Sequence, residues 1–171
     1  MLIAMAGLPG AGKSSVAGEL GRELAAPVVP VDPIEAAMWR AGVARSQPTG
    51  LAAYVVAEAV ADGVLALGQT VIVDAVNAAA EARAQWRSLA SRHGVPVVFI
   101  EVVCSDPVLH RRRLEGRSRG IDGFPEPTWE SVERRRAEFA PWVEDRLVLD
   151  SVLDLSQNIA TALGFLAAPT S

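Results

Sequence analysis

Apolar positions along the chain follow two patterns. Short unbroken apolar runs, closed by glycine, proline or aspartate, are typical of strands that are buried on both faces of a sheet. Between these runs, apolar residues return every three or four positions, which indicates helices with one buried face. Five runs predict strands: Leu2–Ala6, Val28–Asp32, Thr70–Asp74, 95–103 and Arg146–Asp150.

Helix signals fill the intervals between the predicted strands. Pro33 suits the first position of a helix, with Asp32 before it as N-cap and Gly42 near its end. Strands that alternate with helices predict an α/β fold, in which helices cover both faces of a parallel sheet. Helices are predicted over Ser14–Ala25, 33–42, Leu51–Leu67, a stretch ending near His93, 107–117 after Asp106, a stretch starting at Thr128, and 156–166.

Composition and charge narrow the class of protein. The 171 residues suit one domain spanning 1–171, and 50% of them are hydrophobic, enough for a packed core. The formal net charge of −4 argues against a general binder of nucleic acid or of an anionic membrane, because neither attracts an acidic protein. The apolar N-terminal run lacks a basic flank and is too short to span a bilayer, so a cytoplasmic protein is expected.

One eight-residue stretch carries specific chemistry. Residues 7–14, GLPGAGKS, fit the pattern G-x-x-x-x-G-K-[ST] without a mismatch, between a predicted strand and a predicted helix. Glycines let such a loop fold around an anion with its N–H groups pointing inward. Lys13 is the only lysine in the chain, and its compact ammonium suits the β- and γ-phosphates better than a forked guanidinium. The predicted nucleotide-binding residues are Gly7, Leu8, Pro9, Gly10, Ala11, Gly12, Lys13, Ser14 and Ser15.

Two oxygen-bearing residues predict a Mg²⁺ site. The Ser14 hydroxyl ends the loop motif, and Asp74 closes the apolar run TVIVD in the manner of a Walker B strand. Because parallel strands end at one edge of the sheet, Asp74 is expected beside the phosphate loop. The alternative is that Asp74 only caps the following helix.

Asp32, at the end of the second predicted strand, is the candidate general base. In a small parallel-sheet kinase this strand end faces the acceptor rather than the nucleotide. A carboxylate there could accept the proton of an attacking hydroxyl. The alternative, compatible with the first, is that Asp32 is the N-cap before Pro33.

Three longer stretches resemble a known family. VPVDPIEAAMWRAG, VIVDAVNAAAEARAQWRSLA and VVCSDPVLHRRRLEGR are similar to segments of small P-loop kinases of the chloramphenicol phosphotransferase, zeta-toxin and polynucleotide-kinase type, a group that includes bacterial predicted kinases labelled as AAA-family ATPases. The resemblance spans nearly the whole chain. It implies a parallel sheet in the order 2-3-1-4-5, ATP·Mg²⁺ as phosphoryl donor, and Asp32 as the base that activates the acceptor hydroxyl. Two positions depart from the family: Ala75 replaces a frequent Ser or Thr, and Glu35 stands where polynucleotide kinases have an arginine.

The densest positive charge predicts a lid. Arginines 111–113 are followed by Arg117 and Arg119, and then by a Gly- and Pro-rich loop. Arg113 and Arg117 share one helical face, so a lid over about 106–127 is expected to bring both to the transferring phosphoryl group. The alternative, preferred for Arg111, is a solvated helix face. A second run, 133–136, is expected to be solvated as well, although one of its arginines could meet the acceptor.

The acceptor side is less defined in the sequence. Trp39 is a candidate wall of the substrate pocket, and Asn77 and Arg83 are candidate contacts to the acceptor or the phosphates. The segment 33–67 is too short for a large insertion, which favours a small-molecule hydroxyl as acceptor. The sequence predicts an ATP-dependent kinase whose catalytic residues are Lys13, Asp32, Arg113 and Arg117.

Two alternative functions follow from the same residues. A polynucleotide 5′-kinase is disfavoured, because acids outnumber arginines between Asp32 and Gly68. A regulatory ATPase without phosphoryl transfer would need Asp32 only as a helix cap. The identity of the acceptor, the choice between ATP and GTP and the oligomeric state stay open at this point.

Overall fold

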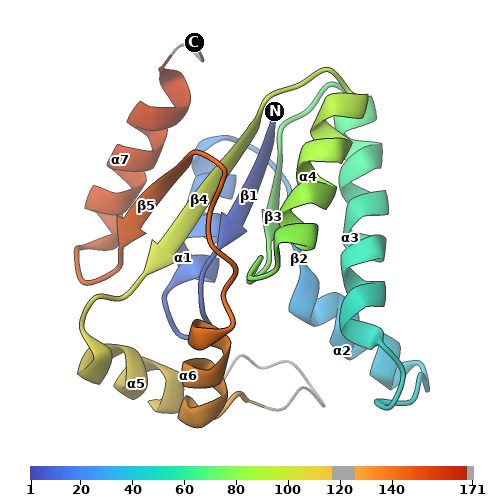
Figure 1. Ribbon diagram of the computed structural model, residues 1–171. Coiled ribbons are helices and arrows are strands. Elements are labelled where there is room, and N and C mark those ends of the chain that lie inside the picture. Colours follow the sequence, from blue (N-terminus) through green and yellow to red (C-terminus); the bar gives the residue numbers. More distant parts are fainter. Residues whose placement is uncertain (117–125, 169–171) are drawn as a thin grey trace.

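Five parallel strands form the centre of the protein (Figure 1). The computed structural model describes residues 1–116 and 126–168. The strand order is β2-β3-β1-β4-β5, which confirms the order that the resemblance implied. The strands are β1 (Leu2–Ala6), β2 (Val28–Pro30), β3 (Val71–Asp74), β4 (Val97–Val103) and β5 (Arg146–Asp150).

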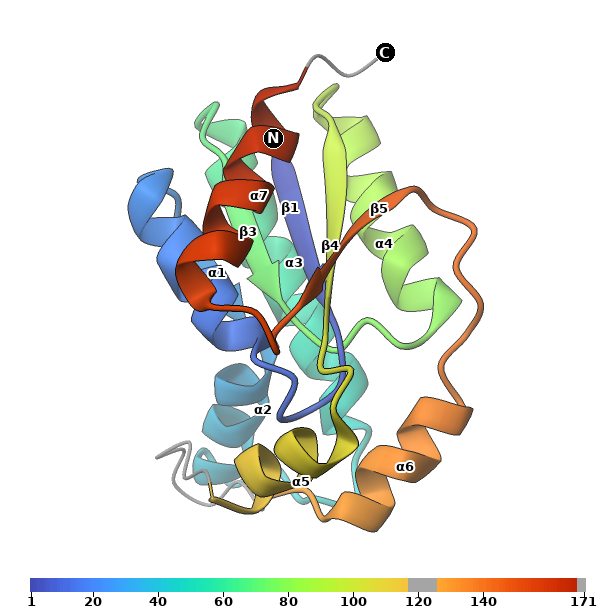
Figure 2. The same cartoon turned by 90° about the vertical axis from the view of Figure 1, so that its left-hand side faces the viewer.

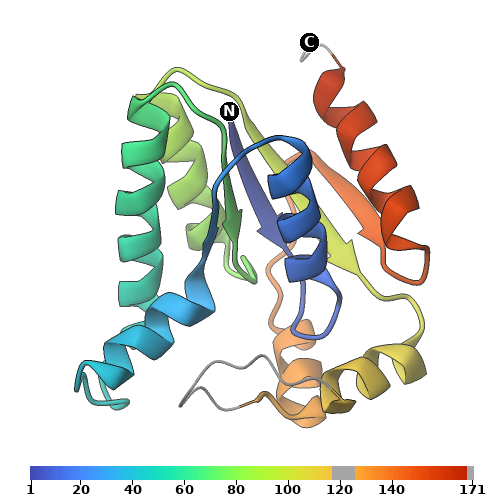
Figure 3. The same cartoon turned by 180° about the vertical axis from the view of Figure 1, so that it is seen from behind.

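Helices cover both faces of the sheet, as the unbroken apolar runs predicted. α1 (Lys13–Glu23) and α7 (Leu155–Ala167) lie on one face, and α3 (Thr49–Ala66) and α4 (Ala80–Arg92) lie on the other (Figures 2 and 3). Successive side chains of a strand point to opposite faces. In β1, Leu2 and Ala4 therefore belong to the core beneath α3 and α4, whereas Ile3 and Met5 belong to the core beneath α1 and α7.

Three further helices lie beyond the carboxyl ends of the strands (Figure 1). They are α2 (Val31–Arg40), α5 (Pro107–Gly116) and α6 (Trp129–Ala137). The start signals of the last two are confirmed. Asp106 Oδ1 accepts hydrogen bonds from the backbone N–H groups of Val108 and Leu109 at 2.9 and 3.0 Å, and Thr128 Oγ1 accepts from Ser131 N–H at 3.3 Å.

Two helix boundaries differ from the prediction, and both concern candidate site residues. β2 ends at Pro30 and α2 begins at Val31, so Asp32 lies in the first helical turn and is not the N-cap. α4 begins at Ala80 with Ala79 as its N-cap, so Asp74 does not cap it either. The capping alternative is therefore wrong for both carboxylates, and each projects from the edge where the strands end.

α3 is long and apolar enough to cross a membrane by length and composition alone, within the described residues. In the structure it packs on β2 and β3 through Ala53, Ala57 and Ala61, which are fully buried. Their spacing of four residues places these small side chains on one face of the helix. Contact with the sheet thus accounts for the apolar residues on one side of α3.

Candidate nucleotide and acceptor site

The loop between β1 and α1 has the backbone geometry of a phosphate loop. Gly7 has φ 135°, and a Cβ there would lie 2.3 Å from the carbonyl oxygen of Val102, so only glycine fits. Gly12, the N-cap of α1, has φ 96°, which L side chains rarely adopt. The first turn of α1 carries no acidic residue, so its N-terminus keeps the positive dipole that attracts phosphate.

Lys13 and Asp74 form an ion pair at the centre of this loop. The Lys13 ammonium donates a short hydrogen bond to Asp74 Oδ1, and both side chains are almost buried, with 11% and 7% of their surface exposed. Lys13 opens α1 and Asp74 ends the neighbouring strand β3, so the fold brings together two residues 61 positions apart. The sequence prediction that Asp74 would lie beside the phosphate loop is confirmed.

A cavity of about 520 Å³ extends from the phosphate loop to the loop between β5 and α7. Lys13, Ser14 and Ser15 line it on one side, and Ser151 to Leu155 line it on the other. Arg113 of α5 also lines this nucleotide cavity, and its Nη1 donates to the Ser151 carbonyl at 3.0 Å and to Ser151 Oγ at 2.9 Å. The structure therefore brings Arg113 to the cavity, held by the β5–α7 loop.

His110 joins the phosphate loop to the two outer helices α5 and α6. Its Nε2 is 2.9 Å from the carbonyl oxygen of Pro9, and its Nδ1 is 3.3 Å from Nη2 of Arg136. These partners fix the neutral tautomer, with Nε2–H donating and Nδ1 accepting. Burial lowers the pKa of His110 and the Arg136 guanidinium lowers it further, against the opposing effect of the Pro9 bond. His110 is thus a neutral connector beneath the phosphate loop.

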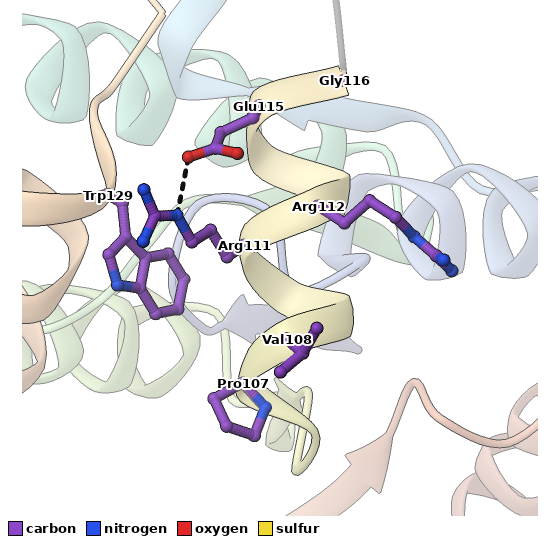
Figure 4. Close-up of a pocket in the computed structure, with 7 residues that line it drawn as sticks. All are labelled: Pro107, Val108, Arg111, Arg112, Glu115, Gly116 and Trp129. Atoms are coloured by element: carbon purple, nitrogen blue, oxygen red, sulfur yellow. Dashed lines mark hydrogen bonds and ion pairs between the residues drawn. The ribbon is translucent and has the colours of Figure 1, made fainter.

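The other arginines of α5 do not line the nucleotide cavity (Figure 4). Arg111 bonds Glu115 at 2.7 Å beside Trp129, and Arg112 points to the other side of the helix. They border an open depression on the outer side of α5, together with Pro107, Val108 and Gly116 (Figure 4). Arg117, the second predicted lid cation, lies outside the described residues, as does most of the predicted lid loop.

The residues present suit a magnesium ion. Mg²⁺ prefers oxygen ligands and is usually held by one or two protein groups together with phosphate oxygens and water. Ser14 lines the nucleotide cavity, and the Asp74 carboxylate is bonded to Lys13 at its edge. No cluster of three or more His, Cys, Asp or Glu occurs among the described residues.

A second cavity, of about 620 Å³, opens next to the first. Asp32, Pro9 and Val76 line both cavities, so Asp32 lies where the two meet. We call this second space the acceptor cavity. Its polar lining comes from four helices and from Glu126, which lies shortly before α6. These residues are Asp32, Glu35, Tyr54, Glu81, Gln85, Glu126 and Arg135.

Tyr54 of α3 brings a hydroxyl to the acceptor cavity. Its oxygen accepts a hydrogen bond from the backbone N–H of Asn77 at 3.2 Å. Burial raises the pKa of this hydroxyl, and the charges of Asp32 and Asp74 raise it further, against the Asn77 bond and Arg135. Tyr54 therefore stays protonated and can donate a hydrogen bond into the cavity.

Asn77 and Arg83 are buried away from both cavities, at 0% exposure. Asn77, at φ 52°, donates through Nδ2 to the Met5 carbonyl at 2.6 Å and accepts from Trp86 Nε1 at 2.8 Å. The Arg83 guanidinium bonds Glu144 and lies 4.4 Å from the Trp142 ring centre. It also donates to the carbonyl oxygens of residues 77, 78, 140 and 141. These two residues hold the loop after β3, so their placement does not support the expected substrate contacts.

Trp39 is connected to the acceptor cavity only indirectly, through a hydrogen-bonded neighbour. It does not line that cavity, and its indole Nε1–H donates to Thr49 Oγ1 at 3.0 Å. Thr49 in turn donates to Glu35 Oε1 at 2.7 Å. Trp39 thus supports a lining residue instead of forming the wall itself, which corrects the expectation from the sequence.

Several lining residues were missed by sequence reasoning. Tyr54 is the only tyrosine of the chain and follows a buried alanine on α3, but no motif marks it. Arg135 was expected only as an unspecified member of the run 133–136, one of whose arginines could meet the acceptor, and it is the member that lines the acceptor cavity. The Ser151–Leu155 loop follows the last strand, and its position at the carboxyl edge of a parallel sheet is the signal that could have indicated it.

The fold and the loop together define a P-loop nucleotide-binding protein. Residues 2–141 match the family described as an AAA domain, and the chain belongs to that family. The comparison with curated proteins found no match.

Several solved structures share the fold. The APS kinase of Mycobacterium tuberculosis, in complex with AMPPNP and APS, is 21% identical with a TM-score of 0.69, over 98% of this chain and 97% of that chain. A gluconokinase of Sinorhizobium meliloti 1021 is 17% identical with a TM-score of 0.68, over 96% and 90%. Kti12 of Chaetomium thermophilum, in complex with ADP-AlF3, is 20% identical with a TM-score of 0.72, over 98% and 100%. At these identities the likeness concerns the fold.

Proposed function

We propose that the protein is an ATP-dependent kinase that transfers the γ-phosphoryl group to a hydroxyl of a small molecule. One observation carries the proposal: Asp32 lines both the nucleotide cavity and the acceptor cavity. A general base must reach the acceptor oxygen while that oxygen approaches the donor phosphorus. The kinases among the structural neighbours support the same reaction class.

In the proposed reaction, the Asp32 carboxylate accepts the proton of the acceptor hydroxyl as its oxygen bonds to the γ-phosphorus. The bond from the γ-phosphorus to the β–γ bridging oxygen breaks, which gives ADP and a phosphate ester. Lys13, Arg113 and the phosphate-loop N–H groups would stabilise negative charge on the transferring group. Ser14 and Asp74 would hold Mg²⁺, which offsets phosphate charge when bound. Arg117 is proposed for the same task as Arg113 on the sequence alone.

The size of the acceptor cavity supports a small molecule as acceptor. Its volume of about 620 Å³ is within the range of small-molecule sites, roughly 300–1,000 Å³. α2, α3, α4 and α6 surround it, which leaves less room for a polymer than an open groove would. The proposal includes a cytoplasmic location, where ATP is available as the donor.

The test measures transfer from γ-labelled ATP with Mg²⁺ into a small-metabolite extract. We expect a new phosphorylated species from the wild type and from Asp145→Asn, an exposed residue outside both cavities. Asp32→Asn should lower the transfer rate by about 10²- to 10⁴-fold, because it removes the proton acceptor, while ATP affinity changes little. Nucleotide binding without any transferred label in the wild type would reject the kinase.

A second candidate is a regulatory nucleotide hydrolase without an acceptor substrate. The similarity to Kti12, solved with ADP-AlF3, favours it, because that structure holds a nucleotide in the same fold. This candidate predicts equal ATP hydrolysis by the wild type and Asp32→Asn, and no phosphorylated product from the extract. The two functions are therefore separated by one pair of proteins in one assay.

A further inference from the structure

The acceptor cavity carries more negative than positive charge. Its described lining includes four carboxylates, from Asp32, Glu35, Glu81 and Glu126, and one cation, Arg135. The only lysine of the chain, Lys13, lines the nucleotide cavity instead. Residues 117–125 carry two arginines and one aspartate, and even both arginines together would not cancel the surplus of three negative charges in the described lining. The cavity would repel an anionic acceptor and attract a cationic one.

Glu35 is the carboxylate that the structure holds in place most clearly. Thr49, at 3% exposure, donates its hydroxyl proton to Glu35 Oε1, and the Trp39 indole donates to the Thr49 oxygen. This chain of bonds ties Glu35 on α2 to the start of α3 and limits its rotamers. Within the described chain, no arginine, lysine or histidine forms an ion pair with Glu35. Its Oε2 is therefore available to a ligand.

Glu35 and Asp32 lie on the same side of α2. They are three residues apart, which in a helix puts their Cβ atoms roughly 5–6 Å from each other. Both line the acceptor cavity, and Asp32 also reaches the nucleotide cavity. A molecule that presents its hydroxyl to Asp32 can therefore place a second polar group, a few bonds away, next to Glu35.

The rest of the cavity wall suits a carbon skeleton. Apart from the Gln85 amide, which donates to the Tyr54 carbonyl at 3.0 Å, and the Tyr54 hydroxyl, the lining residues between the charged groups are small or apolar. Such walls contribute affinity without selecting a charge, so charge selection falls to the carboxylates. The apolar and small members are Pro9, Val31, Gly50, Leu51, Val76, Ala78, Ala79, Ala82 and Pro127.

We propose that the acceptor is a hydroxylated amine, and that Glu35 selects it by binding its ammonium group. This inference rests on the proposed kinase function and names the substrate class of the same site. An ammonium bonded to a partly desolvated carboxylate forms a charge-assisted hydrogen bond, stronger than a neutral one. Glu35 acts on recognition, and Asp32 acts on the hydroxyl.

The first experiment separates the metabolite extract by charge before the assay. At neutral pH an ion exchanger gives cationic, neutral and anionic fractions, and each is incubated with the protein and γ-labelled ATP. We expect the label to enter the cationic fraction and to disappear after amine-selective acetylation of that fraction, which removes the ammonium charge and leaves the hydroxyl free. Label chiefly in the neutral or anionic fraction overturns the inference and leaves the kinase standing. No label in any fraction overturns the kinase, and this inference with it.

The second experiment tests Glu35 itself with Glu35→Gln, whose amide oxygen can still accept the Thr49 bond. We expect kcat/KM for the labelled amine to fall by about 10- to 100-fold, mainly through a higher KM, because one charge-assisted bond is lost. Glu23→Gln makes the same charge change at an exposed position of α1 and should match the wild type. An unchanged KM in Glu35→Gln, or a loss confined to kcat, would assign Glu35 to structure only.

Discussion

The phosphate loop, residues 7–15, forms one side of the nucleotide cavity as a single contiguous segment, to which α5 adds Arg113, whereas the acceptor cavity takes its polar groups from four separate helices and Glu126. The first relies on backbone N–H groups, two glycines that no other residue can replace, and one ammonium. The second relies on side chains whose neighbours in space are distant in sequence. Their charges also differ, since two cations and two carboxylates line the nucleotide cavity, whereas four carboxylates and one arginine line the acceptor cavity.

This difference follows from what each substrate offers. A polyphosphate is the same in every reaction, so one loop geometry serves, and its spacing can be written as a pattern. An acceptor differs from one kinase to the next, so its site is assembled on the helices that cap the strands. Asp32 lines both cavities, so a substitution there tests how the nucleotide cavity and the acceptor cavity work together.

The largest effect is expected on the nucleotide side, from Lys13→Ala. Loss of the ammonium at the phosphate loop should lower the rate of phosphoryl transfer by about 10³-fold, because a preorganised charge next to the phosphoryl group is removed. Lys13→Arg should be nearly as inactive, since a planar guanidinium does not replace the compact ammonium. Transfer assays with both variants check this. An active Lys13→Arg would contradict the view that loop geometry selects lysine.

Arg83→Met should have the next largest effect, on stability. The change takes the guanidinium donor from four carbonyl groups, of which that of Ala78 still accepts from the N–H of Ala140, and it weakens the pairing of Glu144, so we expect the free energy of unfolding to fall by about 3 kcal/mol. Arg87→Met, at a half-exposed partner of the same Glu144, should cost less than about 1 kcal/mol. Denaturant unfolding of both variants measures the contrast. Equal losses in the free energy of unfolding would mean that burial does not determine how much Arg83 contributes to stability.

Tyr54→Phe should act on the acceptor side alone. Removing the hydroxyl takes one hydrogen-bond donor from the acceptor cavity, so the KM for the acceptor should rise by about 10-fold. The KM for ATP, measured in the same assays, should stay within about twofold and serves as the internal control. A parallel rise in both KM values would show that the two cavities are not separable through Tyr54.

The smallest effect concerns His110, whose hydrogen-bond partner Pro9 lines both cavities. Its pKa is lowered by burial in the folded protein, below the usual 6.5, so the unfolded chain takes up the proton first as the pH falls. His110 therefore contributes less to stability as the pH drops below 6.5. His110→Gln should lose this dependence, so the stability difference between wild type and variant should shrink between pH 7.5 and 5.5. If the difference in the free energy of unfolding stays constant between pH 7.5 and 5.5, the pKa of His110 is not lowered in the folded protein.

The sequence predicted the parts of the molecule that local pattern determines. The alternation of apolar runs and helical spacing predicted five strands and the helices on both faces, and the eight-residue motif predicted the loop that Lys13 closes. It was less accurate where tertiary contacts decide. Asn77 and Arg83 have polar side chains near a strand end, which suggested a ligand contact, yet they bind backbone carbonyls that no local pattern reveals.

The acceptor cavity shows the same limit from the other side. Glu35 was noted only as a departure from an arginine in related kinases, because its bond to Thr49 joins two helices and is not readable along the chain. Tyr54 and Arg135 become neighbours of Asp32 only once α3 and α6 are placed at the strand ends. Helix periodicity predicts which face of a helix is buried, but not which cavity the other residues reach.

The single lysine of this chain makes the phosphate loop a natural target for amine chemistry. An amine-selective acylating reagent meets one side-chain amine, that of Lys13, besides any free α-amino group, and Lys13 is nearly buried against Asp74. A nucleotide bound over the loop would shield that amine, so the extent of acylation, read by mass spectrometry, would report occupancy without any mutation. Acetylation of this side chain would likewise remove its positive charge and, on the proposed function, should abolish phosphoryl transfer.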